Sequence, residues 1–341
     1  MIQPFLRPPT RNAEAPSLFE GFFVAAVASF LGIRWFLGIT GYPQIGSHGV
    51  HIAHMLWGGL LMLFAVLLLL AFIGRKVQHV AAVVAGLGFG TFIDEIGKFV
   101  TADNDYFYRP AVALVYLAFV AAFLVARTFL GRRRLSSRES LANALQLLAG
   151  APDGPIKPDD RARIAQVLAR ADSVSTETEL VRRYLAGLPS MAANSSLLVR
   201  MRRRGAESYD LVMASPWAER ALTLGVVAYA GLAFMGVALL VSSGSGSASA
   251  NARLVTIAQV SSTLVGALLV GRGVLSLPSS RIVAYRWFMR GILVWILVTQ
   301  VFVFYSSQLA GLSGLAADLL AYASLRFAIL REISAGRGQP L

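Results

Sequence analysis

Residues 55–73 read MLWGGLLMLFAVLLLLAFI, a run without a single charged side chain. About 20 apolar residues in a row are enough for one α-helix to cross the hydrocarbon core of a bilayer. Similar runs recur along the chain, of which 56% is hydrophobic and only 14% is charged, with a mean hydropathy of +0.63. Because a soluble domain has roughly 25% charged residues, the sequence predicts an all-α, polytopic membrane protein.

Eight apolar stretches are long enough to be transmembrane helices. Their predicted ranges are 17–40, 49–73, 78–100, 110–130, 217–242, 253–277, 285–307 and 311–331. Arg75 and Lys76 follow the second stretch and Arg132 to Arg134 follow the fourth, whereas the connection at 242–250 is uncharged. Since Lys and Arg are retained on the cytoplasmic side, both termini are predicted to face the cytoplasm from a bacterial inner membrane.

A polar segment divides the eight stretches into two groups of four. Ser136 with Glu139, and Thr176 with Glu179, have the spacing of a capping box, so this segment is predicted to be a helical cytoplasmic insert. It is also a candidate surface for a cytoplasmic protein partner. The predicted order is a tail at 1–16, helices 1–4 at 17–131, the insert at 132–216, helices 5–8 at 217–331 and a tail at 332–341.

The composition also excludes several classes of site. The chain has no cysteine, which excludes a disulfide framework, an iron–sulfur cluster and a thiolate zinc site. Its net charge of +13 is concentrated in the connections predicted to be cytoplasmic, where it indicates orientation and contact with membrane lipids. No nucleic-acid partner is expected.

Ionisable side chains are expensive within a bilayer, and here they are expected at one depth. At 1.5 Å per residue, His54 lies about 8 Å below the outer boundary, and Asp94 and Glu95 lie at a similar level. A polar network or pocket open to the outer side is the simplest explanation. The side chains expected there are Arg34, His54, Asp94, Glu95, Lys98, Gln300 and Asp318.

Three histidines open the second stretch at intervals of three residues. His51 and His54 can converge on one ion, with His48 beside them and Glu95 from the next helix as a further ligand. Such nitrogen and oxygen ligands suit zinc or another divalent transition metal. The alternative is that these histidines only donate hydrogen bonds to the carboxylates.

Asp94, Glu95, Lys98 and His54 are the candidate catalytic residues. Asp94 and Lys98 are four residues apart, so they are predicted to pair on one helical face. Arg34, Gln300 and Asp318 are predicted to bind substrate beside them. The carboxylates of Asp94, Glu95 and Asp318 outnumber the cations of Arg34 and Lys98 by one. This excess favours a bound cation or a role in acid–base catalysis, and it is equally compatible with charge-paired helix packing.

Glycines in the second and third stretches are predicted to bring helices together. Gly86 and Gly90 have the small-xxx-small spacing that allows close approach, and Gly58 and Gly59 are expected to do the same.

The loop that follows the third stretch is predicted to lie outside the membrane. Asp103 and Asp105 have the alternate spacing of a calcium loop, but its turn glycine and closing glutamate are missing. Together with Tyr106, they are assigned to substrate binding, as side chains that flank a lipid headgroup or close over the pocket. A capped loop anchored by aromatic side chains is the alternative.

The layout of this region is similar to that of VanZ-like and related uncharacterised bacterial membrane proteins. The residues that carry the resemblance are His54, Gly90, Asp94, Glu95 and Asp103 or Asp105. The chain departs from the pattern in Lys98, in the additional His48 and His51, and in the large insert. The resemblance covers about 60 residues, and it implies a role in the cell envelope.

Three functions are compatible with this sequence. The first is an intramembrane enzyme, with or without a metal, that acts on a lipid or lipid-linked substrate from the outer side. The second is a proton- or cation-coupled transporter that uses the same side chains. The third is a sensor or scaffold in which the polar network is purely structural.

Overall fold

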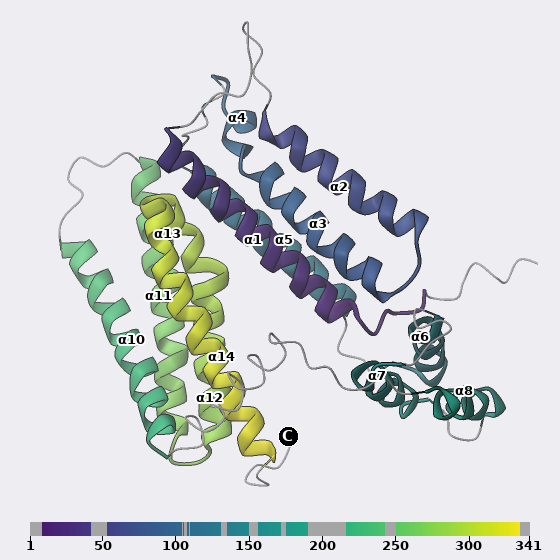
Figure 1. Cartoon of the computed structure of the whole chain (residues 1–341). Coiled ribbons are helices and arrows are strands. Elements are labelled where there is room, and N and C mark those ends of the chain that lie inside the picture. The colour runs from purple at the N-terminus through teal and green to yellow at the C-terminus, as the bar shows by residue number, and fades with distance from the viewer. Residues whose placement is uncertain are drawn as a thin grey trace, which may run out of the picture. The chain divides into compact units, whose positions relative to one another are not determined.

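The fold was analysed in a computed structural model of the chain, which describes residues 9–41, 53–103, 105, 108, 110–130, 135–149, 156–171, 175–189, 216–242 and 250–334. Within these ranges the regular elements are all helices, which confirms the all-α prediction (Figure 1). The chain forms two compact units, of which the first comprises Met1–Tyr106 with Ala121–Asn194 and the second comprises Phe107–Val120 with Ser195–Leu341.

The first unit contains long apolar helices and the short helices of the insert. The long helices are α1 (Ala15–Thr40), α2 (His54–Ala71), α3 (Arg75–Ile93) and part of α5 (Ala111–Leu130), with the short α4 (Ile96–Val100) after α3. The insert comprises α6 (Ser137–Ala149), α7 (Pro158–Leu168) and α8 (Thr176–Gly187). The third predicted transmembrane stretch is thus interrupted, because Asp94 and Glu95 form a turn between α3 and α4.

Helix α3 packs against both α1 and α2 through glycines. A Cβ atom on Gly86 or on Gly90 would overlap the carbonyl oxygen of a residue in α1, and Gly58 of α2 lies equally close to Gly88 of α3. The packing role predicted for Gly58, Gly86 and Gly90 is confirmed. The prediction for Gly59 is wrong, because no atom of the described structure lies within 4 Å of the position of its Cβ.

The insert is a small helical layer with an apolar core of its own. Ile164, Leu168 and Val181 are among its buried side chains. The predicted capping box of α6 is confirmed, since Glu139 N–H donates to Ser136 Oγ and Ser136 N–H donates to Glu139 Oε2. The cap predicted at Thr176 is wrong by one residue: the Ser175 side chain accepts the hydrogen bond from Thr178 N–H, so Thr176 is the first residue of α8.

The second unit is a bundle of long helices. Its elements are α10 (Pro216–Ser242), α11 (Ala250–Ser276), α12 (Arg281–Val294), a π-helical segment (Trp295–Thr299), α13 (Gln300–Ser307), a 3₁₀ turn (Gln308–Gly311) and α14 (Leu312–Ser334). Tyr285, Phe288 and Ile292 of α12 lie in its core together with Leu325 of α14. The chain passes from α13 to α14 through Gln308, whose φ of 49° is positive.

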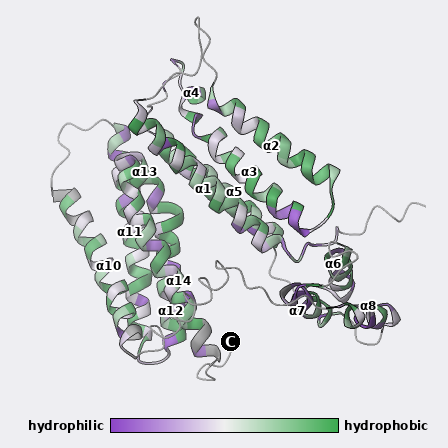
Figure 2. Ribbon diagram, viewed as in Figure 1, coloured by the Kyte–Doolittle hydropathy of each residue, from purple (hydrophilic) through white to green (hydrophobic). Residues whose placement is uncertain are grey.

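The long helices consist largely of hydrophobic residues, which Figure 2 shows in green. Leu70 is 78% exposed and Ile73 is 90% exposed, which is typical of surfaces that face lipid. Among the residues that the structure describes, six stretches are long and apolar enough to cross a membrane, which supports the membrane-protein class, while the predicted count of eight stays a prediction. They are Ala15–Thr40, His54–Ala71, Arg75–Ile93, Ala111–Leu130, Ala250–Ser276 and the 49-residue Arg281–Ile329.

Candidate functional site

Five charged or ionisable side chains of the first unit gather where α3 ends. Asp94 and Glu95 occupy the turn between α3 and α4, and both side chains are fully buried. The close packing of α3 through its glycines brings this turn up to α1 and to the first residues of α2. The turn cluster consists of Arg34 from α1, His54 from α2, Asp94, Glu95, and Lys98 from α4.

Asp94 is held by two neighbouring helices. The Arg34 side chain donates through Nε to Asp94 Oδ1 and through Nη2 to the Asp94 carbonyl oxygen, the latter at 3.1 Å. The other carboxylate oxygen, Oδ2, lies 3.0 Å from His54 Nε2. Both oxygens of this buried carboxylate are therefore satisfied, which offsets the cost of removing it from water.

Glu95 is held in the same way from the other side. Its Oε2 accepts the backbone N–H of Met55 at 2.9 Å, which satisfies a free donor in the first turn of α2. Its Oε1 pairs with Lys98 Nζ and lies 3.5 Å from His54 Nδ1. The sequence predicted a pair between Lys98 and Asp94, but the break in the helix at Asp94 removes the spacing on which that prediction relied.

The His54 ring lies between the two carboxylates. Each ring nitrogen faces a carboxylate oxygen, and an imidazole can donate from both nitrogens only in its protonated form. The His54 side chain is 23% exposed, whereas Asp94 and Glu95 are completely buried. The ring is therefore oriented by two carboxylates and remains partly exposed.

A metal site is absent from the part of the chain that the structure describes. No group of three or more metal-ligating side chains has a suitable arrangement there. The oxygens of Glu95 already face Lys98 and Met55 N–H, which compete with any cation for them. His48 and His51, two of the four predicted ligands, lie outside the described residues, so the zinc hypothesis stays a prediction.

The loop after α4 is described only in part. Thr101 Oγ1 accepts the backbone N–H of Asp105 at 2.7 Å and donates to the carbonyl oxygen of Gly97. Asp103 is exposed, and Tyr106 lies outside the described residues. The observed bonds are those of a capped loop, and the substrate-binding role of Asp103, Asp105 and Tyr106 stays a prediction.

Gln300 and Asp318 belong to the second unit, whereas the turn cluster belongs to the first. The structure brings these two side chains to one cavity of about 280 Å³ between helices of the second unit. The balance of three anions and two cations predicted from the sequence counts Asp318 together with the turn cluster, and it stays a prediction. Without Asp318, Asp94 and Glu95 are matched by Arg34 and Lys98.

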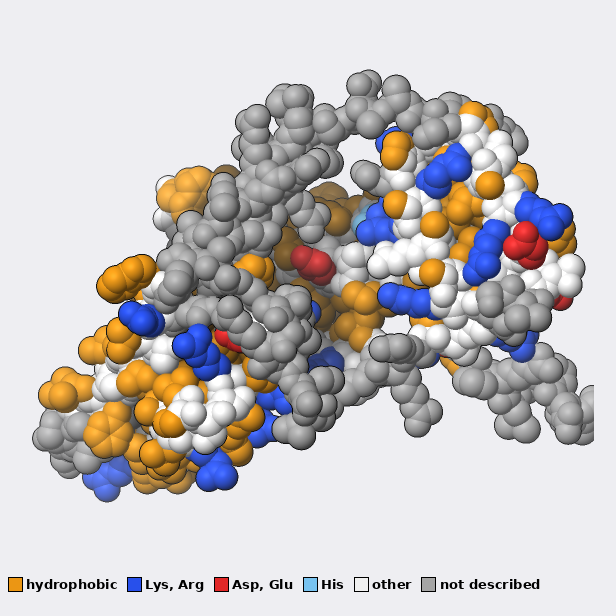
Figure 3. Space-filling view, turned by 90° about the horizontal axis from the view of Figure 1, so that it is seen from below, with side chains coloured by type: hydrophobic (Ala, Val, Ile, Leu, Met, Phe, Trp, Pro, Cys, Tyr) orange, Lys and Arg blue, Asp and Glu red, His pale blue; other side chains and the backbone are white. Residues whose placement is uncertain are grey.

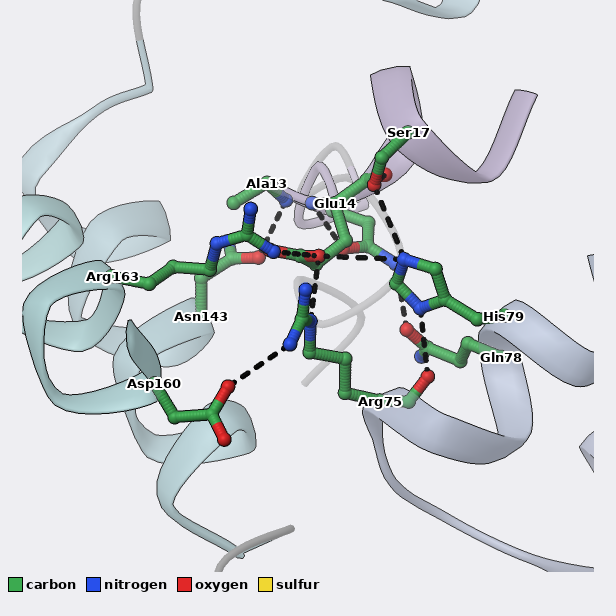
Figure 4. A network of polar contacts seen from close by, with 10 residues as sticks. Ala13, Glu14, Ser17, Arg75, Gln78, His79, Asn143, Asp160 and Arg163 are labelled. Carbon is green, nitrogen blue, oxygen red and sulfur yellow. Dashed lines mark hydrogen bonds and ion pairs between the residues drawn. The ribbon is translucent and has the colours of Figure 1, made fainter. Parts of the chain in front are cut away.

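A second polar network, which the sequence did not indicate, joins the insert to the starts of α1 and α3 (Figure 4). The carboxylate of Glu14 is 8% exposed and pairs with Arg75 of α3 at 3.0 Å and with Arg163 of α7 at 2.9 Å. His79 Nε2 lies 3.8 Å from the same carboxylate. An acidic residue next to an apolar stretch was the available signal, but its partners lie 61 and 149 positions further along the chain.

A further ion pair connects α6 to the residues before α1. Arg11 donates to both carboxylate oxygens of Glu139, each at 2.9 Å. This hydrogen-bonded partner, together with the backbone N–H of Ser136, lowers the pKa of Glu139 well below its usual range. Asn143 adds a reciprocal contact, because its side chain accepts from Ala13 N–H and donates to the Arg11 carbonyl oxygen.

The chain matches no protein-family model, no curated protein and no solved structure with which it was compared. The resemblance to VanZ-like proteins therefore stays a prediction from the sequence.

Proposed function

We propose that this protein crosses a bacterial inner membrane eight times, as two sets of four helices separated by the cytoplasmic insert. Arg281–Ile329 contains two of these spans, on either side of the 3₁₀ turn, and the apolar stretch Arg220–Gly236 of α10 supplies another. The distribution of Lys and Arg supports a cytoplasmic location for both termini and for the insert. Figure 3 shows Lys and Arg side chains of the described residues in blue.

We further propose that the turn cluster is an acid–base site that acts on a lipid or lipid-linked substrate from the outer side. The observation that supports this is the position of His54, which is partly exposed and lies between two fully buried carboxylates. A histidine oriented by a carboxylate is a common general acid or base, because its pKa lies near neutral pH before any perturbation.

Each neighbour of His54 has a distinct role in this proposal. Asp94 orients the ring through Nε2, and Glu95 does so through Nδ1. Arg34 and Lys98 pair with Asp94 and Glu95 respectively. Since both cations already face carboxylates, they can hold an anionic headgroup of the substrate only by sharing these contacts with it.

The test compares the lipid composition of three strains from which the native gene has been deleted. One strain receives the wild-type gene, one receives the His54→Gln variant, and one receives no copy. His54→Gln retains a side chain of similar length that hydrogen-bonds but does not exchange protons near neutral pH. We expect the lipid profile of His54→Gln cells to match that of cells without the gene. A wild-type profile in cells that contain folded His54→Gln protein would rule out acid–base catalysis by this residue.

A structural role for the turn cluster is the second candidate, and complete charge pairing is the observation that favours it. Asp94 pairs with Arg34 and Glu95 pairs with Lys98, as in a network that only fixes helix packing. Thermal unfolding of the same variants separates the two roles. A structural network predicts a large fall in Tm for His54→Gln with no change in lipids, whereas an acid–base site predicts the reverse.

Metal content tests the metal-dependent form of the proposal. Purified wild type and the His51→Ala/His54→Ala double variant are compared by elemental mass spectrometry. Near-stoichiometric metal that is lost in the folded double variant would support a metalloenzyme. Wild type without metal, after purification without chelator, would leave His54 as a proton-transfer group alone.

A further inference from the structure

The cavity of the second unit is independent of the turn cluster and of the function proposed for it. It lies among α10, α11, the π-helical segment, α13 and α14, with a volume of about 280 Å³. A water molecule occupies roughly 30 Å³ in the liquid, so this space accommodates a ligand of several heavy atoms. Tyr229, Gln259, Trp295, Gln300 and Asp318 are among the side chains that line it.

Asp318 gives the cavity an uncompensated acceptor. Its side chain is only 2% exposed, and Oδ1 has no hydrogen-bond partner in the described part of the chain. The Tyr229 side chain lines the same cavity as Asp318. The lining includes no Lys, Arg or His, so a ligand must supply any positive charge that matches this carboxylate.

Two aromatic rings form a rigid wall beside Asp318. The rings of Tyr229 and Trp295 meet edge to face, with centroids 5.4 Å apart and an angle of 76° between their planes. Trp295 Nε1 donates to the carbonyl oxygen of Thr263 at 3.2 Å, which fixes the indole. Gly266 makes room for that indole, since a Cβ at this position would overlap it. Aromatic faces attract organic cations.

The backbone at the cavity is also irregular. Trp295–Thr299 is a π-helical segment between α12 and α13, and it places Trp295, Thr299 and Gln300 on the cavity wall. Single π-helical turns are rare and are frequent at functional sites. The side chains of Gln300 and Thr299 are held in place by hydrogen bonds to the Gly311 carbonyl oxygen and to Ser262 Oγ.

We infer that this cavity binds a small organic ammonium cation, with Asp318 as its counter-ion and the rings of Tyr229 and Trp295 against its carbon atoms. The unsatisfied carboxylate oxygen favours a ligand with a positively charged N–H or ammonium group, and the aromatic wall favours apolar groups around the nitrogen. The volume exceeds that of a bare metal ion. The same chemistry is found in free amines and in the ammonium headgroup of a lipid.

The test is direct binding to the full-length protein in nanodiscs of phosphatidylglycerol, with ethylamine and choline as probes and tryptophan fluorescence as the readout. Wild type is expected to bind at least one probe saturably. Asp318→Asn is expected to weaken that binding about tenfold to a hundredfold, the usual effect of losing a charge-assisted contact. Equal affinity in wild type and Asp318→Asn would overturn the inference.

Glu332→Gln is the matched control. Glu332 is a second buried carboxylate on α14, but it faces Arg281 at 3.9 Å and does not line the cavity. This variant removes the same charge from the same helix and is expected to bind as wild type does. His54→Gln should also leave binding unchanged, which separates this inference from the function proposed for the turn cluster.

The lipid source is distinguished by repeating the titration in nanodiscs that contain phosphatidylethanolamine. If the headgroup occupies the cavity, the apparent affinity for free amines falls, and native mass spectrometry shows phosphatidylethanolamine retained by wild type but not by Asp318→Asn. Unchanged amine binding identifies a free amine as the ligand. Absence of both saturable amine binding and selective lipid retention refutes the inference.

Folding of the key variant is checked by thermal unfolding. Because Asp318 has an unsatisfied buried oxygen, Asp318→Asn is expected to match or exceed the Tm of wild type. Should Asp318→Asn fold poorly, Tyr229→Leu provides an independent variant, since it removes one ring of the wall. It is expected to weaken choline binding, and unchanged choline affinity in folded Tyr229→Leu would contradict the assigned role of the ring.

Discussion

At the scale of single residues, the absence of a side chain decides how closely α1, α2 and α3 approach one another. A Cβ on Gly90 would overlap the carbonyl oxygen of Ala26, and one on Gly86 would overlap that of Phe22. Gly59 has the same small size, yet its Cβ position is open. The sequence indicated which glycines had packing spacing, but only the structure shows which of them contact another backbone.

Gly90→Ala is expected to lower stability by about 1–3 kcal/mol, the usual cost of overpacking, because helix α1 would have to move. Gly59→Ala is the control, and it is expected to be neutral or to stabilise α2 by about 0.5–1 kcal/mol through helix propensity. Unfolding of both purified variants in the same detergent measures the difference. Equal stability of the two variants would show that α1 and α3 are not in backbone contact at Gly90.

At the scale of elements, the turn between α3 and α4 determines which charges meet. An uninterrupted helix would place Asp94 and Lys98 on one face, as the sequence predicted. Because of the turn, Lys98 pairs with Glu95, whereas Asp94 pairs with Arg34 and His54. Neither Gly nor Pro marks this break, so sequence reasoning had no local signal for it. The contacts from α1 and α2 that satisfy both carboxylates are tertiary.

The attachment of the insert is also an element-scale property, and it is expected to depend on Glu14. Glu14→Gln leaves Arg75 and Arg163 without their shared anion, so α6–α8 should open more easily. The expected cost is about 1–3 kcal/mol, which corresponds to roughly fivefold to 150-fold faster hydrogen exchange in these helices. Glu20→Gln, in which the replaced carboxylate is exposed, is the control. The same exchange rates in both variants would mean that Glu14 does not hold the insert.

At the scale of the whole molecule, the proposed orientation can be tested by chemical labelling because the chain contains no cysteine. Ser245→Cys, in a connection proposed to lie outside, should react with a membrane-impermeant thiol reagent on intact cells. Ser279→Cys, in a connection proposed to lie inside, should react only after the membrane is permeabilised. The opposite pattern would invert the topology, and labelling of both in intact cells would contradict the single span proposed between the two positions.

The sequence by itself determined the class of the protein, the positions of its apolar helices and the helical nature of the insert. These properties depend on local composition and spacing, as in the Ser136–Glu139 capping box, and burial in lipid requires no specific partner. Only the tertiary structure decided which polar groups meet. It joined Glu14 to Arg163, paired Lys98 with Glu95, and assigned Asp318 to a cavity of its own. Equal depth in a membrane fixes neither the order of helices nor the direction of a side chain, so contacts between distant segments cannot be read from spacing along one helix.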